Sequence, residues 1–284
     1  MNFLAHPETD KIIHAALQED FAGGDITALS VIPDTAESSA RCLIKDDGIL
    51  AGIAFAERVF RIFDPNLKME ILLTDGNPVK KGDIAFYVTG KTQSILSCER
   101  LVLNAMQRMS GIATTTHEVV KMLEGTKCKV LDTRKTTPLI RHLEKWAVTI
   151  GGGTNHRFGL YDMVMIKDNH HDFVGGITNA VIRCQAYLKA HNIQVKIEVE
   201  TRNLDEVAET LGLTGVDVIM LDNMDNETMR KAVEMINGKC KVEASGGITP
   251  ETVRQIAETG VDFISMGALT HSVKSLDISL KAMK

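Results

Sequence analysis

The feature of this sequence that most constrains its fold is a repeated alternation of short apolar runs with helical segments. Six runs rich in β-branched residues have the near-continuous hydrophobicity of strands buried on both faces. The last four are spaced by roughly 22 residues, the span of one compact strand–helix unit. We therefore expect an α/β fold with a β/α barrel, and a doubly wound open sheet is the alternative. The runs are KVLDTRK (129–135), MVMIKDN (163–169), VKIEVE (195–200), VDVIMLDN (216–223), KVEASGG (241–247) and VDFISMGAL (261–269).

The first 110 residues have a different pattern, which predicts a small α+β domain. A helix is expected near residues 8–20, and strands are expected near 38–46, 69–74 and 84–89, separated by turn-forming segments. A long helical segment follows, with a break predicted near Ser110-Gly111. The sequence thus predicts an N-terminal domain over 1–110 and a barrel domain over 111–284.

Charge and cysteine content exclude several classes of protein. The chain has 284 residues, a net charge of −5 and a pI near 6.0, which argue against nucleic-acid or membrane-surface binding. No apolar run approaches the roughly 18 residues of a spanning helix, and the N-terminus lacks the pattern of a signal peptide. The five cysteines have no metal-binding spacing, so we expect reduced thiols in a soluble cytoplasmic protein.

Functional side chains or glycines lie at the ends of all six predicted strands. In β/α barrels the active site lies at the C-terminal ends of the strands, so this pattern predicts an enzyme. A solvated charge could end any one strand, but a whole set at one edge is typical of a site. The set comprises Arg134-Lys135, Lys167-Asp168, Glu198 and Glu200, Asp222-Asn223, Ser245-Gly246-Gly247, and Gly267.

These strand ends sort by charge. The first two strands, with His156-Arg157 in the loop between them, supply cations that bind carboxylates and phosphates. The next two supply Glu200 and Asp222, which can hold hydroxyl groups, a divalent metal or developing positive charge. The last two supply glycines whose N–H groups can approach a phosphate. We therefore expect a phosphorylated sugar, a second anion and a metal.

Other sites are less consistent with the sequence. GGGTNH (151–156) follows a helical segment and precedes a strand, the opposite order to a dinucleotide-binding fingerprint. A serine hydrolase would need a nucleophile elbow, which the sequence lacks. His170 and His171 are adjacent and would point in different directions, so we interpret them as structural rather than as zinc ligands.

Several motifs together resemble the quinolinate phosphoribosyltransferase family, which belongs to the type II phosphoribosyltransferases. The resemblance covers nearly the whole chain, with the motifs in the same order and at sensible spacing. The motifs are EDFAGGDIT (19–27), ERLVLNAMQRMSGIAT (99–114), LDTRKTTP (131–138), EKWAV (144–148), GGGTNHRFGLYDMVMIKDNH (151–170), VKIEVE (195–200), MLDN (220–223), EASGGI (243–248) and SMGALTHS (265–272).

The resemblance implies a decarboxylating pentosyltransferase of NAD biosynthesis that uses Mg²⁺. Its substrates would be quinolinate and phosphoribosyl pyrophosphate, and its products nicotinate mononucleotide, pyrophosphate and CO₂. The implied fold is an incomplete β/α barrel with an N-terminal α+β sandwich-like domain, on which a helix at the extreme C-terminus would pack. The implied assembly is a homodimer, or a higher homo-oligomer such as a hexamer built from dimers, in which the N-terminal domain contributes to the partner's site.

The resemblance also implies roles for individual residues. Arg134, His156 and Arg157 would bind the two carboxylates of quinolinate, with Arg100 arriving from the partner subunit. Lys135 and Lys167 would hold the anionic substrates and act in catalysis, with Glu200 and Asp222 contacting the ribose and the metal. The groups implied at the phosphate are Lys135, Lys167, Ser245, Gly246, Gly247, Gly267 and His271.

Some interpretations remain open from the sequence. A related family associated with molybdate transport shares the fold and much of the glycine-rich region, although TRKT and NHR favour quinolinate. A barrel that binds a nucleotide without turnover is a second alternative. Glu198 could be purely structural. Arg141, His142 and Lys145 could line the entrance of the site or form a solvated helix face, and we favour the solvated face.

Overall fold

The structure is a computed structural model, and it describes residues 3–283. The chain forms two compact units that interleave along the sequence. The first comprises residues 3–117, 136–152 and 269–283, and the second comprises 118–135 and 153–268. The functional division into a domain over 1–110 and a catalytic domain over 111–284 stays a prediction.

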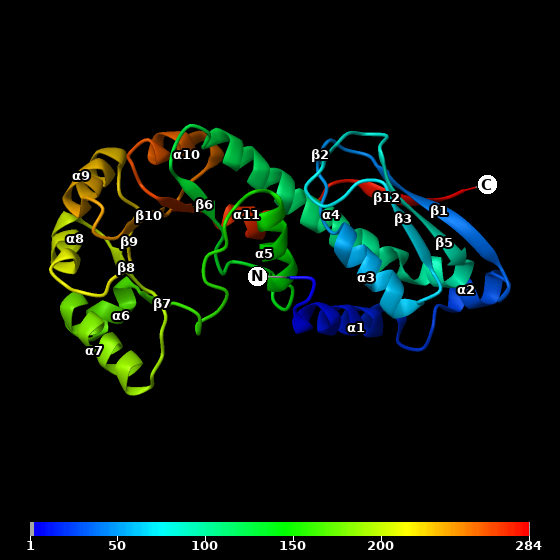
Figure 1. Cartoon of the computed structure of the whole chain (residues 1–284), viewed down its shortest axis with the longest axis horizontal. Helices are drawn as coiled ribbons and strands as arrows, with labels where there is room; N and C mark the ends of the chain where they lie inside the picture. The colour runs from blue at the N-terminus through cyan, green and yellow to red at the C-terminus, as the bar shows by residue number, and fades with distance from the viewer. Residues whose placement is uncertain (1–2, 284) are drawn as a thin grey trace. The chain divides into compact units, whose positions relative to one another are not determined.

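The second unit is built on a curved parallel sheet, with helices on its outer side (Figure 1). Its strand order is β6-β11-β10-β9-β8-β7, so from β7 to β11 each strand pairs with its successor and the last pairs with the first. In a doubly wound sheet the order in which successive strands are added reverses in the middle of the sheet. No such reversal occurs from β7 to β11, so that alternative is excluded. No pairing between β6 and β7 occurs among the described residues, so the barrel is incomplete, as predicted. The strands are β6 (Lys129–Leu131), β7 (Val164–Ile166), β8 (Ile197–Thr201), β9 (Val218–Asp222), β10 (Lys241–Ser245) and β11 (Phe263–Ser265).

Helices α8, α9 and α10 begin where the sequence supplies caps, and α6 begins directly after β7. Asn203 accepts a hydrogen bond from the N–H of Glu206 at the start of α8, and Thr249 precedes Pro250 at the start of α10. These polar caps satisfy N–H groups that a helix leaves without an internal partner. The helices are α6 (Asp168–Phe173), α7 (Ile177–Ala190), α8 (Leu204–Leu211), α9 (Asn226–Ile236) and α10 (Pro250–Ala257).

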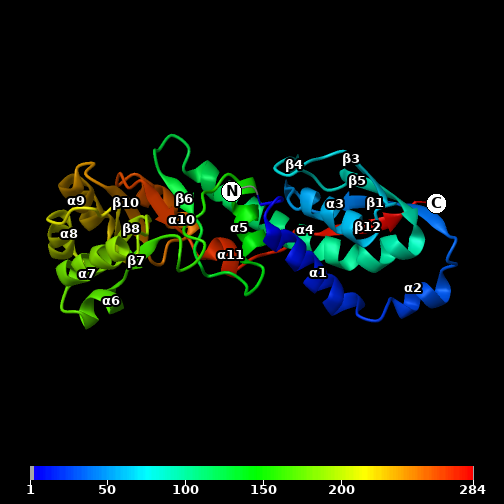
Figure 2. The same ribbon diagram turned by 60° about the horizontal axis from the view of Figure 1, so that its bottom comes forward.

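The first unit contains an antiparallel sheet of strand order β12-β1-β5-β3, with α3 packed against it (Figure 2). Phe60 of α3 meets Phe86 of β5 edge to face, with ring centroids 6.0 Å apart. The predicted α+β character is therefore confirmed. The elements are α1 (Pro7–Phe21), α2 (Ile26–Val31), β1 (Glu37–Ile44), β2 (Gly48–Ile49), α3 (Ile53–Phe63), β3 (Lys68–Ile71), β4 (Pro78–Val79), β5 (Ile84–Lys91), α4 (Thr92–Met122), α5 (Arg141–Ile150), α11 (Ala268–His271) and β12 (Ile278–Ala282), with α4 and α11 running on into the second unit.

The expected helix at the extreme C-terminus is a strand. β12 pairs antiparallel with β1, with Leu280 opposite Cys42. Ile278 and Leu280 are buried while Lys281 is exposed, an alternation that suits one face of a sheet. The prediction that the C-terminal segment packs on the N-terminal domain is correct in place but wrong in secondary structure.

The predicted break at Ser110-Gly111 is also wrong, because α4 is continuous from Thr92 to Met122. Gly111 has a different function. A Cβ atom there would lie 2.2 Å from the carbonyl oxygen of Lys274. The glycine therefore permits close approach of the chain segment that leads to β12.

Two further findings concern cysteines and membranes. All five cysteines are free thiols, as the sequence predicted. Burial raises the pKa of both Cys42 and Cys98 to about 12, which makes these two thiols unreactive. Across residues 3–283, none of the helices is long and apolar enough to traverse a lipid bilayer.

Replacing Gly111 with alanine should destabilise the protein. Alanine gains about 1 kcal/mol in helix propensity, but forcing a methyl group against a backbone carbonyl costs about 1–3 kcal/mol or more. The free energy of unfolding, measured by urea denaturation, should therefore fall. Gly23→Ala is the matched control, because nothing lies within 4 Å of a Cβ atom at that position. A Gly111→Ala protein as stable as the control would contradict this account.

Candidate active site

The C-terminal edge of the parallel sheet brings together most of the predicted site residues of the second unit. Lys167 directly follows β7, and Glu200 lies one residue before the end of β8. Asp222 and Ser245 are the last residues of β9 and β10 and stand opposite each other in the register. Gly267 follows β11 after one intervening residue. Because parallel strands end at a common edge, these groups form one site.

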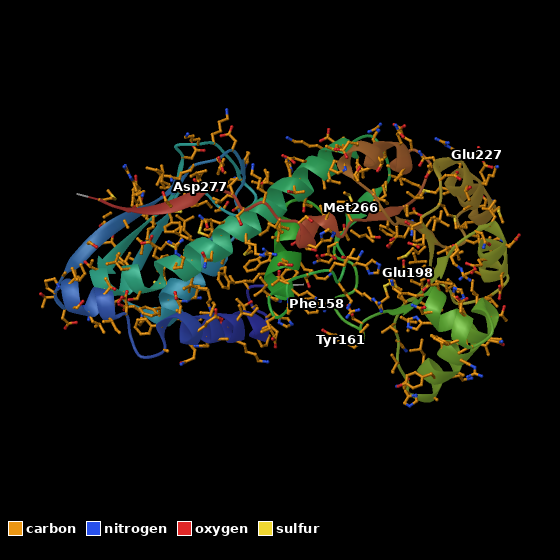
Figure 3. The ribbon with its side chains drawn as sticks, turned by 180° about the vertical axis from the view of Figure 1, so that it is seen from behind. Phe158, Tyr161, Glu198, Glu227, Met266 and Asp277 are labelled. Atoms are coloured by element: carbon orange, nitrogen blue, oxygen red, sulfur yellow. The ribbon has the colours of Figure 1, made fainter. Side chains whose placement is uncertain are left out.

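The inner side of the sheet carries the glutamates of β8. Ile197 and Val199 pack outward against Ile177 and Val181 of α7. Successive side chains of a strand alternate between faces, so Glu198 and Glu200 point to the inner side. Figure 3 shows Glu198 there, whereas Glu227 lies on the outer helix layer. The apolar face thus fixes the direction of both carboxylates.

A buried cluster of His156, Glu198 and Glu243 lies inside the barrel. His156 Nε2 is 3.1 Å from Glu198 Oε2 and 3.3 Å from Glu243 Oε2. The side chains of the glutamates are at most 2% exposed, and that of His156 is 6% exposed. β8 and β10 are alternate strands of the barrel, which is why their inward side chains meet in one layer.

The ionisation of this cluster follows from burial and proximity. Burial lowers the pKa of His156, but the hydrogen bonds that its ring donates to Glu198 and Glu243 outweigh this and raise the pKa to about 10. Burial raises the pKa of Glu198 to about 7, opposed by His156 and reinforced by Glu243. The backbone N–H of Arg157 donates a hydrogen bond to His156 Nδ1 at 2.7 Å. This contact requires that Nδ1 carry no proton. A proton on Nε2 facing the carboxylates satisfies both sets of contacts.

Two arginines adjoin the cluster. Burial lowers the pKa of Arg157, and the neighbouring charge of Arg134 lowers it further. Arg157 Nη1 also donates to the carbonyl of Met163 at 3.3 Å. Two guanidinium groups that repel each other beside a buried imidazole favour the binding of an anion between them. Arg134 thus lies near Arg157, which follows His156 in the chain, and the roles of the three residues stay predictions.

The carboxylates nearer the sheet edge have polar partners of their own. Lys167 Nζ lies 3.4 Å from Glu200 Oε2, with Lys167 46% exposed and Glu200 8% exposed. Asp222 Oδ2 accepts a hydrogen bond from Asn223 Nδ2 at 2.7 Å. A cation and two carboxylates at adjacent strand ends suit a sugar phosphate whose hydroxyl groups need acceptors.

The turn after β10 has room for a ligand. Gly246 has a φ of +96°, and a Cβ atom there would lie 2.2 Å from Asn223 Oδ1. Gly247 has a φ of +59° with nothing within 4 Å of a Cβ position. Both conformations favour glycine, and the turn leads into α10.

Three predicted site residues have a less specific setting. Lys135 is exposed, and its N–H donates to Thr133 Oγ1 at 3.0 Å. Arg100 is exposed on α4, and His271 ends α11 with Nδ1 2.7 Å from Ser272 Oγ. Arg100 and His271 belong to the first unit. Their roles stay predictions.

Sequence reasoning missed the residues beneath the cations. Asp132 is fully buried and accepts the N–H of His156 at 2.8 Å, and Glu243 completes the buried cluster. The sequence did contain a signal for Glu243, because an acidic residue within a buried strand needs a polar partner. The interpretation of His142 and Lys145 as solvated is wrong, because they are 2% and 0% exposed.

Removing the His156 imidazole should destabilise the second unit strongly. His156→Ala would leave two buried carboxylates without the imidazole that faces both of them, at a cost of about 3–5 kcal/mol. Lys167→Ala breaks a half-exposed pair and should cost less than about 1 kcal/mol. Urea denaturation at neutral pH measures both. Equal losses would show that the buried cluster contributes no special stability.

Comparison with known proteins is consistent with this geometry. The family of the quinolinate phosphoribosyl transferase C-terminal domain matches residues 112–281, and that of the N-terminal domain matches 25–110. A chloroplastic nicotinate-nucleotide pyrophosphorylase (carboxylating) of Arabidopsis thaliana is 50% identical over 295 residues, covering 98% of this chain and 84% of the relative. A probable enzyme of the same name from Bacillus subtilis is 43% identical over 275 residues, covering 97% and 93%.

Solved structures agree with the sequence matches. The crystal structure of NadC from Streptococcus pyogenes superposes with a TM-score of 0.91 at 38% identity, covering 98% of each chain. The similarity includes both domain families and extends over nearly the full chain. This chain therefore belongs to the quinolinate phosphoribosyltransferase family.

Proposed function

We propose that this protein transfers the phosphoribosyl group of phosphoribosyl pyrophosphate to quinolinate, with decarboxylation, in NAD biosynthesis. The products are nicotinate mononucleotide, pyrophosphate and CO₂. Relatives named for this activity, similar over nearly the whole chain, support the assignment. The structural observation that carries it is the pair of arginines beside buried His156, which suits an aromatic ring with adjacent carboxylates.

The strand ends divide the substrates between them. Arg134, His156 and Arg157 hold the two carboxylates of quinolinate. Glu200 and Asp222 accept hydrogen bonds from the ribose hydroxyls. The groups that hold the anionic sugar substrate are Lys135, Lys167, Ser245, Gly246, Gly247, Gly267 and His271. The proximity of Lys167 to Glu200 supports placing the sugar between the arginines and the glycine turn.

The chemistry requires positioning and charge stabilisation more than proton transfer. The pyridine nitrogen attacks the anomeric carbon with its own lone pair as the bond to pyrophosphate breaks. Positive charge develops on the ribose ring, where Glu200 and Asp222 stabilise it. The bond from the ring to the carboxylate next to the nitrogen then breaks, its electron pair stays on the ring carbon beside the cationic nitrogen, and that carbon takes up a proton. The arginines contribute by fixing the ring in place.

A divalent metal fits the donor set at this edge. Glu200 and Asp222 offer oxygen ligands from adjacent strands, and Mg²⁺ is commonly held by one or two carboxylates plus substrate phosphates. We assign Mg²⁺ to these two residues and the sugar pyrophosphate. When bound, it would neutralise charge on the departing pyrophosphate.

Assembly and location complete the proposal. We assign a homodimer, with higher homo-oligomers built from it, in which Arg100 of one protomer enters the site of the other. The exposure of Arg100 on α4 supports this role. Five free thiols support a reducing compartment, for which we propose the cytoplasm.

Replacing Arg157 with alanine should abolish most turnover of quinolinate. Losing a bidentate, charge-assisted contact costs kcat/KM about 10²- to 10³-fold. Nicotinate mononucleotide and CO₂ would be quantified with quinolinate, nicotinate, nicotinamide or no base. The matched control is Arg230→Ala, an exposed arginine of α9. Turnover of another base, or binding of the sugar pyrophosphate without product, would refute the assignment and favour the molybdate-associated or non-catalytic alternatives.

Mixing two inactive variants tests the origin of Arg100. Arg100→Ala and Arg157→Ala should each be nearly inactive as purified proteins. If the site is shared, exchange between them forms mixed dimers with one intact site, restoring about a quarter of wild-type activity. The measurement is turnover after co-refolding at equal concentrations. No recovery, with dimer exchange verified by differently tagged protomers, would place Arg100 in the site of its own chain or outside both sites.

A further inference from the structure

Two buried acids have no role in the proposed reaction. Glu198 and Glu243 are 0% and 1% exposed. One oxygen of each carboxylate faces His156 Nε2, at 3.1 Å from Glu198 Oε2 and 3.3 Å from Glu243 Oε2. Burying a carboxylate costs several kcal/mol unless it is well paired, so a pair retained inside an anion-binding barrel needs an explanation.

Their contacts lead to Arg157 through His156. The two carboxylates face His156 Nε2 at 3.1 and 3.3 Å, and Nδ1 of the same ring accepts the N–H of Arg157 at 2.7 Å. Rotation of the ring would break the contacts on both sides at once. The ring therefore links two barrel strands to the backbone of the arginine.

The backbone of this segment is fixed independently. Asp132, just after β6, accepts the N–H of His156 at 2.8 Å. Glu198 and Glu243 lie within β8 and β10, so three strands of the sheet hold one loop. Rigid elements that support a binding group in this way preserve its geometry before the ligand arrives.

We propose that Glu198 and Glu243 are positioning residues that orient the His156 ring and thereby aim Arg157 at a carboxylate of the pyridine dicarboxylate. This inference rests on the proposed function, because it takes Arg157 to bind that substrate. Glu198 and Glu243 act on the substrate only through His156 and Arg157.

Positioning and simple charge effects have opposite signs, which makes the proposal testable. Glu198→Gln and Glu243→Gln keep the side-chain shape but remove a negative charge near an anion site. If the acids only counter the arginine charge, removing one strengthens binding of a dianion. If they position Arg157, binding weakens.

The first experiment measures the dissociation constant of quinolinate by calorimetry, together with KM for each substrate. Both variants should weaken quinolinate binding about 10- to 100-fold and change KM for the sugar pyrophosphate less than about twofold. Glu227→Gln, an exposed acid of α9, is the matched control and should bind as wild type. Unchanged or tighter quinolinate binding in both variants would overturn the proposal.

A double-mutant cycle tests the route through His156. In a His156→Gln background, Glu243→Gln should weaken quinolinate binding by less than about twofold, because the residue through which it acts is already lost. Full additivity would show that Glu243 acts on the substrate by another path and would overturn the proposal.

Two further readouts keep the outcomes distinct. If the glutamine variants do not fold, NMR of the wild-type protein should show a slowly exchanging Nε2–H on His156, and a freely exchanging ring would contradict positioning. Wild-type turnover is measured in parallel. Absent turnover refutes the proposed function, whereas normal turnover with unaffected variants refutes only this inference.

Discussion

The pairing of one imidazole with two buried carboxylates is the interaction on which the second unit depends. Glu198 of β8 and Glu243 of β10 are buried inside the barrel, and Nε2 of the His156 ring faces both carboxylates. A charge inside a barrel is tolerated only with a close partner, because water cannot reach it. The cluster therefore ties the loop at 153–163 to the sheet and gives the neighbouring arginines a fixed base.

The rest of the site follows from strand direction. Because all six strands of the described sheet run parallel, their C-terminal ends share one edge. Cations from β6 and β7 thereby meet carboxylates from β8 and β9 and the glycine turn after β10. The cations and the carboxylates therefore occupy separate parts of one edge. This arrangement suits a reaction that joins two anions while positive charge develops between them.

Much of this arrangement could be predicted from the sequence because its signals are local. Near-continuous apolar runs marked the strands, and polar residues after them marked Lys167, Glu200 and Asp222. Prediction failed where the deciding contact is distant in sequence. A break was predicted at Gly111 because glycine weakens a helix. The glycine is needed instead for close packing against the carbonyl of Lys274, which is 163 residues away in the sequence. The C-terminal strand depends similarly on β1.

Periodicity and spacing along the chain are enough to predict the fold class, the edge of the sheet where polar residues gather and the sorting of their charges. Which acids lie at that edge and which lie deeper in the barrel depends on contacts between distant parts of the chain. Glu198 and Glu200 share a strand face, yet one pairs with His156 and the other with Lys167. Depth within the barrel separates them, and depth is set by strand stagger and by partners such as Glu243, which no local pattern encodes.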